Sequence, residues 1–380
     1  AGPCGGCSLR HLDYAAELCA KQENVADAFA RIGGLDVPVL PIVGSPEVNR
    51  YRNKVQFPVG VDKSGKPCIG FYAGRTHRIV PCPDCRLQPG VLNEIGNALC
   101  AFFAEKGIQP YSEETGRGLV RHIFLRRGAH SGQIMVCLVC TRAKLPSAEE
   151  LCTRLKAQFA EITTILLNVN AKNTNVILGT ETHTLYGPGY IEDTLCGVPV
   201  QLGPLSFYQV NTLAAEQLYG IAAQYAQLTP DDLLLDLYCG MGTIGLSMAA
   251  HCRELIGVEI VPEAIESAKA NAARMGADVA AKSRFFCADA GQAATRLAAE
   301  GLHPDIVMLD PPRKGCDEAT LSAVVRMSPR RVVYVSCNPA TAARDAAWLE
   351  QNGYHAEKVQ PVDLFPRTRH CECVLSLSKV

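Results

Sequence analysis

The sequence predicts an α/β fold with a parallel, doubly wound sheet in its second half, preceded by a smaller α+β domain. From Leu202 onward, short apolar strands alternate with helical segments, which is the pattern of a parallel sheet with crossover helices. From Tyr51 to about Tyr190 the chain instead contains strand-like runs separated by turn residues. With 380 residues, 48% hydrophobic and 20% charged, the chain can form two or three domains with real cores.

The composition says more about where in the cell the protein works than about which molecule it binds. No apolar stretch approaches the ~18 residues of a membrane helix, and the N-terminal AGPCGGCSLR lacks the features of a signal peptide, so we expect a cytoplasmic protein without a membrane partner. The 18 cysteines are scattered through apolar runs, which favours reduced thiols over disulfides. Residues 1–190 hold 21 Lys and Arg against 16 Asp and Glu, whereas residues 191–380 hold 16 against 22. A basic excess this small allows nucleic-acid binding but does not decide it, and nothing indicates an obligate protein partner.

The first half begins with Cys4-Gly-Gly-Cys7 and a helix from about Tyr14 to Ile32, which Gly33-Gly34 ends. Strands are predicted, in order, at 54–61, 68–74, 122–128, 133–141, 163–170 and 175–179, with helices near 90–106 and 147–160. Basic and aromatic side chains lie close together in this segment, a mixture suited to phosphates and unstacked bases. They are Arg50, Arg52, Lys54, Arg75, Arg78, Arg121, Arg126 and Arg127, with Tyr51, Phe57, Phe71, Tyr72 and Phe124. Alternatively, the aromatics form the core and the arginines a solvated face.

In the second half, apolar strands are predicted at 233–240, 255–260, 284–290, 305–312 and 331–337, and two more near 355–362 and 373–378. A glycine-rich segment follows the first of these strands, Asp236-Leu-Tyr-Cys-Gly-Met-Gly-Thr-Ile-Gly245. Its glycines fit a G-x-G-x-x-G spacing, which would equally suit a dinucleotide. Glu259 ends the next strand, Asp289 closes the third and Asp310 the fourth. Three acids at one sheet edge resemble the S-adenosylmethionine pocket of class I methyltransferases. Each acid could instead be a helix N-cap or turn former, and for Asp289 both alternatives are equally plausible.

The strand Val332–Val335 stops at Ser336-Cys337-Asn338-Pro339, so Cys337 should lie at the carboxyl edge of the sheet, where ligands of α/β folds bind. Cys337 is therefore a candidate nucleophile, although a cysteine is also a small apolar core residue. Asp310-Pro-Pro-Arg-Lys-Gly315 is a rigid turn with positive charge beside it.

Several ordered motifs extend over nearly the whole chain. They are Cys4-Gly-Gly-Cys7, Tyr51-Arg-Asn-Lys54, Phe207-Tyr-Gln209-Val-Asn211, DLYCGMGT, DPPRKG, SCNP and FPRTRHCE. In these motifs the chain resembles the RNA 5-methyluridine methyltransferase family, and the CGGC start is most similar to its bacterial, iron–sulfur 23S rRNA members. The resemblance implies a class I, Rossmann-like catalytic domain at 196–380, an α+β RNA-binding domain at 37–195, and a cysteine motif with a helix at 1–36.

By the same resemblance, Cys337 would be the nucleophile and Glu372 the base. The S-adenosylmethionine site would comprise Gln209, Tyr238, Gly240, Thr243, Glu259, Asp289 and Asp310. The chemistry agrees, because uracil C5 needs a thiolate on C6 before it can take a methyl group, and a base must then remove the C5 proton. Arg313 or Arg369 could lower the pKa of the thiol.

Cys4-x-x-Cys7 and Cys82-x-x-Cys85 could form a four-thiolate site for zinc or an iron–sulfur cluster, and spacing does not choose the metal. The resemblance favours a [4Fe-4S] cluster with Cys4, Cys7 and Cys85 as ligands. The family's first ligand would lie five residues before Cys4, so we expect an N-terminally truncated chain, with Cys82 as a possible substitute. Reduced structural thiols are the alternative.

The sequence thus predicts an enzyme that methylates C5 of a uridine in 23S rRNA. The first alternative is the T-loop uridine of tRNA. A second is a non-catalytic RNA-binding protein on a methyltransferase scaffold, which would need neither Cys337 nor Glu372. A cytosine-C5 enzyme and a nicotinamide-dependent oxidoreductase are further alternatives.

Overall fold

The computed structural model describes residues 4–74, 76–172 and 176–380 and divides the chain into two compact units. The first comprises residues up to Ser8, Glu47–Thr194 and Gln201–Thr212, and the second Leu9–Pro46, Leu195–Val200 and Leu213–Val380. This division differs from the predicted boundaries, because the segment 1–36 does not form a unit of its own. Its cysteine motif belongs to the first unit, whereas its helix packs in the second.

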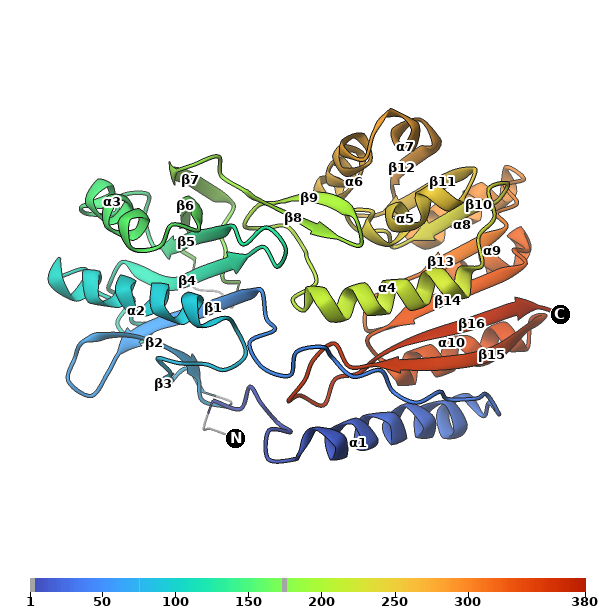
Figure 1. Ribbon diagram of the computed structural model, residues 1–380, viewed down its shortest axis with the longest axis horizontal. Coiled ribbons are helices and arrows are strands. Elements are labelled where there is room, and N and C mark those ends of the chain that lie inside the picture. Colours follow the sequence, from blue (N-terminus) through green and yellow to red (C-terminus); the bar gives the residue numbers. More distant parts are fainter. Residues whose placement is uncertain (1–3, 75, 173–175) are drawn as a thin grey trace. The chain divides into compact units, whose positions relative to one another are not determined.

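The first unit is an α+β fold around a mixed sheet with the strand order β3-β2-β1-β4-β5-β6-β7 (Figure 1). The strands are β1 (Lys54–Val61), β2 (Pro67–Tyr72), β3 (Ile79–Pro81), β4 (Val120–Arg127), β5 (Ile134–Cys140), β6 (Ile162–Val169) and β7 (Glu181–Tyr186). Neighbouring strands are antiparallel except β5 and β6, and this parallel pair requires the crossover that helix α3 (Ala148–Gln158) supplies. α3 and helix α2 (Gly90–Glu105) contribute to one apolar core with β4 and β5.

Most predicted strands of this unit are confirmed, but the one at 175–179 is wrong. Asn175 lies outside the described residues, as does Arg75, and the segment that follows is a loop whose Val176 and Ile177 carbonyls accept hydrogen bonds from the Asn170 side chain. The strand β7 follows this loop, and the sequence did not predict it because its residues, ETHTLY, are mostly polar. A hairpin of β8 (Ile191–Leu195) and β9 (Val198–Leu202) was also not predicted.

The second unit contains the predicted doubly wound sheet, with the strand order β12-β11-β10-β13-β14-β16-β15 (Figure 1). The strands are β10 (Leu233–Leu237), β11 (Glu254–Glu259), β12 (Ser283–Cys287), β13 (Ile306–Leu309), β14 (Arg331–Ser336), β15 (Tyr354–Val362) and β16 (Glu372–Lys379). β10 to β14 are parallel, and β16 inserts antiparallel between β14 and β15. Strand order reverses at β10, and the crevice at such a switch point is where ligands of this fold class bind.

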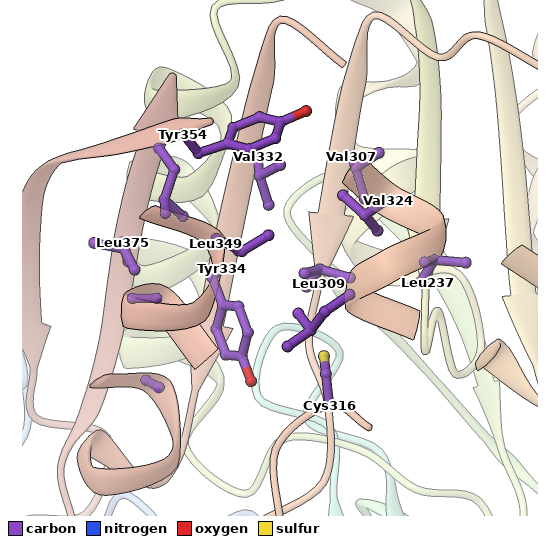
Figure 2. Packing of buried hydrophobic residues seen from close by; sticks show 14 of the residues in the cluster. Leu237, Val307, Leu309, Cys316, Val324, Val332, Tyr334, Leu349, Tyr354 and Leu375 are labelled. Atoms are coloured by element: carbon purple, nitrogen blue, oxygen red, sulfur yellow. The ribbon is translucent and has the colours of Figure 1, made fainter. Parts of the chain in front are cut away.

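Helices cover the second sheet and connect its strands. They are α1 (Tyr14–Asp27), η1 (Ala28–Gly33), α4 (Thr212–Ala226), α5 (Thr243–Met248), η2 (Ala249–His251), α6 (Pro262–Arg274), α7 (Ala277–Lys282), α8 (Ala290–Ala299), α9 (Glu318–Met327) and α10 (Pro339–Glu350). Figure 2 shows Leu309 and Val332 of adjacent strands packing toward Val324 of α9 and Leu349 of α10. This burial is the physical reason for the uninterrupted apolar strands in the sequence. In the part of the chain that the structure describes, no helix is both long enough and apolar enough to span a bilayer.

Candidate active site

Cys337 occupies the turn between β14 and α10. The Asn338 N–H donates to Ser336 Oγ at 3.0 Å, and the Asn338 side chain donates to the Arg313 carbonyl at 3.0 Å and caps the helix at Ala340. Pro339 occupies the first helical turn, where its missing N–H costs nothing. These local bonds hold Cys337 at the carboxyl edge of the sheet, the place that the sequence predicted, and the thiol there is half-buried.

The thiol faces a recess of about 280 Å³ within the second unit. Its lining comes from α1, the DPPRKG turn, the SCNP turn and the loop between β15 and β16, namely Asn24, Arg313, Cys337, Asn338, Pro339, Arg369, His370 and Cys371. Arg313 is hydrogen-bonded to the thiol, and it is one of the two arginines that the sequence offered as groups that could lower the pKa of Cys337. A larger cavity of about 550 Å³, which includes Lys314 and Trp348, contains neither Cys337 nor a predicted cofactor residue.

Sheet register brings Glu372 to Cys337. β16 runs antiparallel to β14 with Ser336 opposite Cys373, so the next residues along the two strands, Cys337 and Glu372, meet at the end of the ladder. Glu372 is 6% exposed. Burial, and secondarily the charge of Asp310, raises the pKa of its carboxyl to about 8, which is close to an ordinary working pH and suits a general base.

The electrostatics of the thiol have opposing contributions. Burial raises the pKa of Cys337, and the neighbouring acids Glu372 and Asp310 raise it further, whereas Arg313 lowers it by its charge and its hydrogen bond. Asp310 keeps some exposure, but surrounding protein atoms still raise the pKa of its carboxyl to about 7. In the ligand-free protein the thiol and Glu372 therefore favour their neutral forms at neutral pH.

The glycine loop after β10 is arranged around Glu259. The Gly240 N–H donates to Glu259 Oε2 at 3.2 Å, and the Val261 N–H donates to Oε1 at 2.9 Å. Gly240 has φ +55°, and a Cβ there would meet no atom within 4 Å, so open space lies over the loop. Tyr238 also has a positive φ, +66°, a strained conformation for a bulky residue that is typical of functional sites. Its hydroxyl lies 3.3 Å from Thr320 Oγ1. An open glycine turn beside an oriented carboxylate fits S-adenosylmethionine.

Asp236, which the sequence reasoning left out of the site, lies under this loop. It is 1% exposed, and its Oδ2 accepts from the Gly245 N–H at 3.0 Å. Its Oδ1 is buried without a hydrogen-bond partner among the described residues, and burial raises its pKa to about 8. The available signal was one acid inside the apolar strand LLLDL, which is costly unless it has a role.

The other predicted cofactor residues lie in different settings. Thr243 is buried at the start of α5, and Asp310 directly follows β13. Asp289 is the N-cap of α8, where its side chain accepts from the Gln292 N–H at 3.1 Å, so the helix-capping alternative describes its observed bond. Gln209 belongs to the first unit, where its carbonyl accepts from the Asn53 side chain at 2.7 Å.

The basic and aromatic residues of the first unit divide into two groups. Arg126 is 1% exposed and donates to the carbonyls of Gly203 and Ser206, and Arg121 donates to those of Asn170 and Lys172. The side chains of Tyr51, Phe57 and Phe124 are also buried. The three aromatic residues therefore belong to the core, as the structural alternative expected, whereas Arg121 and Arg126 are buried against carbonyl groups and form neither a phosphate-binding surface nor a solvated face. Lys54 is only partly buried, and burial together with Arg126 and Arg52 lowers its pKa to about 8.

The cysteine motif is only partly assembled. The Cys82 and Cys85 thiols are hydrogen-bonded to each other, which together with burial raises the pKa of Cys82, and Cys4 is close enough to contribute electrostatically. Within residues 4–74, 76–172 and 176–380, however, no group of three or more His, Cys, Asp or Glu side chains has an arrangement that could hold a metal ion. The predicted cluster with Cys4, Cys7 and Cys85 stays a prediction.

The chain is similar to known RNA methyltransferases. Residues 131–380 match the family described as tRNA (Uracil-5-)-methyltransferase. An uncharacterized RNA methyltransferase of Oceanobacillus iheyensis is 42% identical over 99% of this chain and 81% of its own length. Another, from Halalkalibacterium halodurans, is 44% identical over 98% of this chain and 81% of its own length.

Among solved structures, the tRNA (uracil-54, C5)-methyltransferase of Pyrococcus abyssi, in complex with S-adenosyl-L-homocysteine, superimposes with a TM-score of 0.80. It is 27% identical, and the match covers 99% of this chain and 86% of that one. The predicted fold class and the predicted kind of enzyme are confirmed. This chain belongs to the RNA uracil-5 methyltransferase family, whose members are S-adenosylmethionine-dependent RNA methyltransferases.

Proposed function

We propose that this enzyme methylates C5 of a uridine in 23S rRNA, with Cys337 as the nucleophile and Glu372 as the base. The observation that carries the proposal is the meeting of these two side chains at the end of the β14–β16 ladder, beside a recess lined by Arg313 and Arg369. Few structural roles require a half-buried thiol beside a buried acid at the carboxyl edge of a sheet. A thiol nucleophile with a nearby base is, however, what uracil methylation requires.

In the first step, the Cys337 thiol ionises and its sulfur adds to C6 of the uracil. The 5,6 double-bond electrons move onto C5 and O4 as an enolate. Arg313 favours this step because its charge and hydrogen bond stabilise the thiolate. The glycine loop and Glu259 would hold S-adenosylmethionine, which would supply the methyl group: C5 attacks the methyl carbon, the S–CH3 bond breaks, and S-adenosylhomocysteine leaves with that electron pair.

In the second step, the Glu372 carboxylate removes the remaining C5 proton. The C5–H electrons re-form the 5,6 double bond, the C6–S bond breaks, and Cys337 leaves as a thiolate. Glu372 is then protonated, the state that its raised pKa favours. Burial thus makes Glu372 a stronger base than an exposed carboxylate.

The choice of RNA rests on two observations that favour different substrates. The cysteine motif, in which Cys4 lies near the Cys82–Cys85 pair, supports a 23S rRNA enzyme through its resemblance to the iron–sulfur members of the family. Similarity to a structure described as a tRNA (uracil-54, C5)-methyltransferase supports tRNA as the second candidate.

Both substrates can be tested with matched rRNA and tRNA fragments that contain 5-fluorouridine. Fluorine at C5 cannot leave as a proton, so an active enzyme stays attached to its RNA on a denaturing gel. We expect an adduct with the rRNA fragment, and none with Cys337→Ser. An adduct with tRNA alone would contradict the rRNA assignment, and no adduct with either RNA would contradict the proposed chemistry.

We further propose that the cysteine motif binds a [4Fe-4S] cluster, with Cys4, Cys7 and Cys85 as ligands and Cys82 as a substitute. Thiolates are the ligands that such clusters use, and three of these four cysteines interact in the first unit. Anaerobically purified protein should contain iron and absorb visible light, and Cys85→Ala should lose both. Absence of iron from the unaltered protein would refute the assignment.

A further inference from the structure

Helix α1 presents a polar face to the loop that joins β15 to β16, and the two charged residues at the middle of that face are buried. Tyr14, Glu17, Lys21 and Asn24 recur every three or four residues, so they share one side of the helix. Glu17 and Lys21 are 0% and 2% exposed. Long charged side chains are rarely buried so completely without a specific partner.

Tyr14, Glu17 and Lys21 each bond to the loop, and Tyr14 also accepts from the Ser45 N–H at 2.8 Å. Lys21 Nζ donates to Glu17 Oε1 at 2.8 Å, to Asp363 Oδ1 at 2.7 Å and to the Phe365 carbonyl at 3.2 Å. The Tyr14 hydroxyl donates to the other oxygen of Asp363 at 2.9 Å. The Arg367 N–H donates to Glu17 Oε1 at 2.6 Å.

This network constrains a loop whose backbone is strained. Arg367 has φ +69°, a left-handed conformation that costs a non-glycine residue free energy. The bond to Glu17, together with those between Leu9 N–H and the Arg367 carbonyl and between Arg367 Nη1 and the Leu12 carbonyl, maintains it. The rings of Phe365 and His370 meet edge to face with centroids 6.2 Å apart, which connects the loop anchor to the recess.

The network is not needed to attach the N-terminal segment. The extended chain after α1 pairs with β15 at Val39–Val359 and Val43–Val362, with backbone hydrogen bonds on both sides. A buried ion pair adds little stability compared with well-packed apolar residues of the same volume. Its bond directions, however, define one loop conformation.

We propose that Lys21 is a positioning residue for methyl transfer. By connecting Glu17 to Asp363 and Phe365, it holds residues 363–371 so that Arg369, His370 and Glu372 meet Cys337. This inference rests on the proposed roles of Cys337 and Glu372. Lys21 itself acts only through the loop, because the recess is lined on α1 by Asn24, one turn further along the helix.

The test separates the two chemical steps on unmodified RNA. In Lys21→Met, Cys337 still adds to C6, but a displaced Glu372 removes the C5 proton slowly. We expect turnover to fall by roughly tenfold to a hundredfold, the usual cost of small misplacements, while the gel-stable adduct with unmodified RNA and S-adenosylmethionine increases several-fold. A general folding defect would lower turnover and adduct together, and that result, or unchanged turnover, would overturn the proposal.

Two further variants keep the test decisive. Lys21→Met leaves two buried carboxylates without their cation and could fail to fold, so Lys21→Met/Asp363→Asn removes one charge of each sign and should still accumulate the adduct. Lys269→Met, which removes an exposed lysine of α6, should resemble the unaltered enzyme. Glu372→Gln should accumulate the adduct in the same gel. If it does and the Lys21 variants do not, only the positioning role fails, whereas if Glu372→Gln does not, the proposed base is wrong.

Discussion

Glu372 should destabilise the ligand-free protein at neutral pH, so Glu372→Gln should stabilise it while stopping turnover. Burial raises the pKa of this carboxyl from 4.5 to about 8. Below pH 4.5 the group is neutral in the folded and the unfolded chain and costs nothing. As pH rises toward 8, the unfolded chain ionises and the folded one does not, so stability is lost.

The size of the effect follows from the two pKa values. Each pH unit between them costs about 1.4 kcal/mol, so the disadvantage is about 1 kcal/mol at pH 5 and about 3 kcal/mol at pH 7. A glutamine keeps the shape of the side chain and never ionises. The stability difference between Glu372→Gln and the unaltered protein should therefore grow with pH by these amounts.

Urea unfolding of both proteins at pH 5, 6, 7 and 8 measures this difference. Glu300→Gln, at the exposed end of α8, is the matched control and should change stability by less than about 0.5 kcal/mol at every pH. A difference between Glu372→Gln and the unaltered protein that does not vary with pH would refute the reasoning, because the buried acid would then ionise as easily as an exposed one.

Three other predictions concern the same unit. Turnover should rise with pH through about 8, where the Glu372 carboxyl loses its proton, and should keep rising above that pH, because the Cys337 thiol, whose pKa is raised above its ordinary value, must ionise as well. Arg313→Ala should move that rise to higher pH, and a profile that does not shift would exclude Arg313 from this role. Gly240→Ala should weaken S-adenosylhomocysteine binding in calorimetry with a stability cost of only about 1–2 kcal/mol, because its φ is +55° but its Cβ enters open space. In Gly257→Ala the Cβ would lie 2.5 Å from the Phe285 ring, so thermal unfolding should reveal a larger loss of stability, and equal losses in the two variants would contradict this comparison.

The sequence alone was sufficient for the parallel strands of the second sheet and for its glycine loop, but not for the antiparallel pairing of β15 and β16. Runs such as the uninterrupted Val332–Val335, or Leu233–Leu237 with its single acid, are typical of strands covered on both faces, and the structure buries them. The turn at SCNP is also determined by its own residues, because Asn338 caps α10 and Pro339 begins it. The positions of strands and helix ends, and of Cys337 at the end of its strand, depend on neighbouring residues, so local patterns predicted them.

Only the tertiary structure decided which distant residues meet. The antiparallel insertion of β16 places Glu372 at Cys337, and the docking of α1 brings Lys21 to Asp363. The tertiary structure also buries Arg126 among carbonyl groups, although the sequence suggested that Arg126 binds a phosphate. Register and helix docking are determined by contacts between segments far apart in the chain, whose free energy no local pattern contains. The motifs therefore predict the kind of enzyme, whereas the arrangement of the residues proposed for its chemistry could be read only from the tertiary structure.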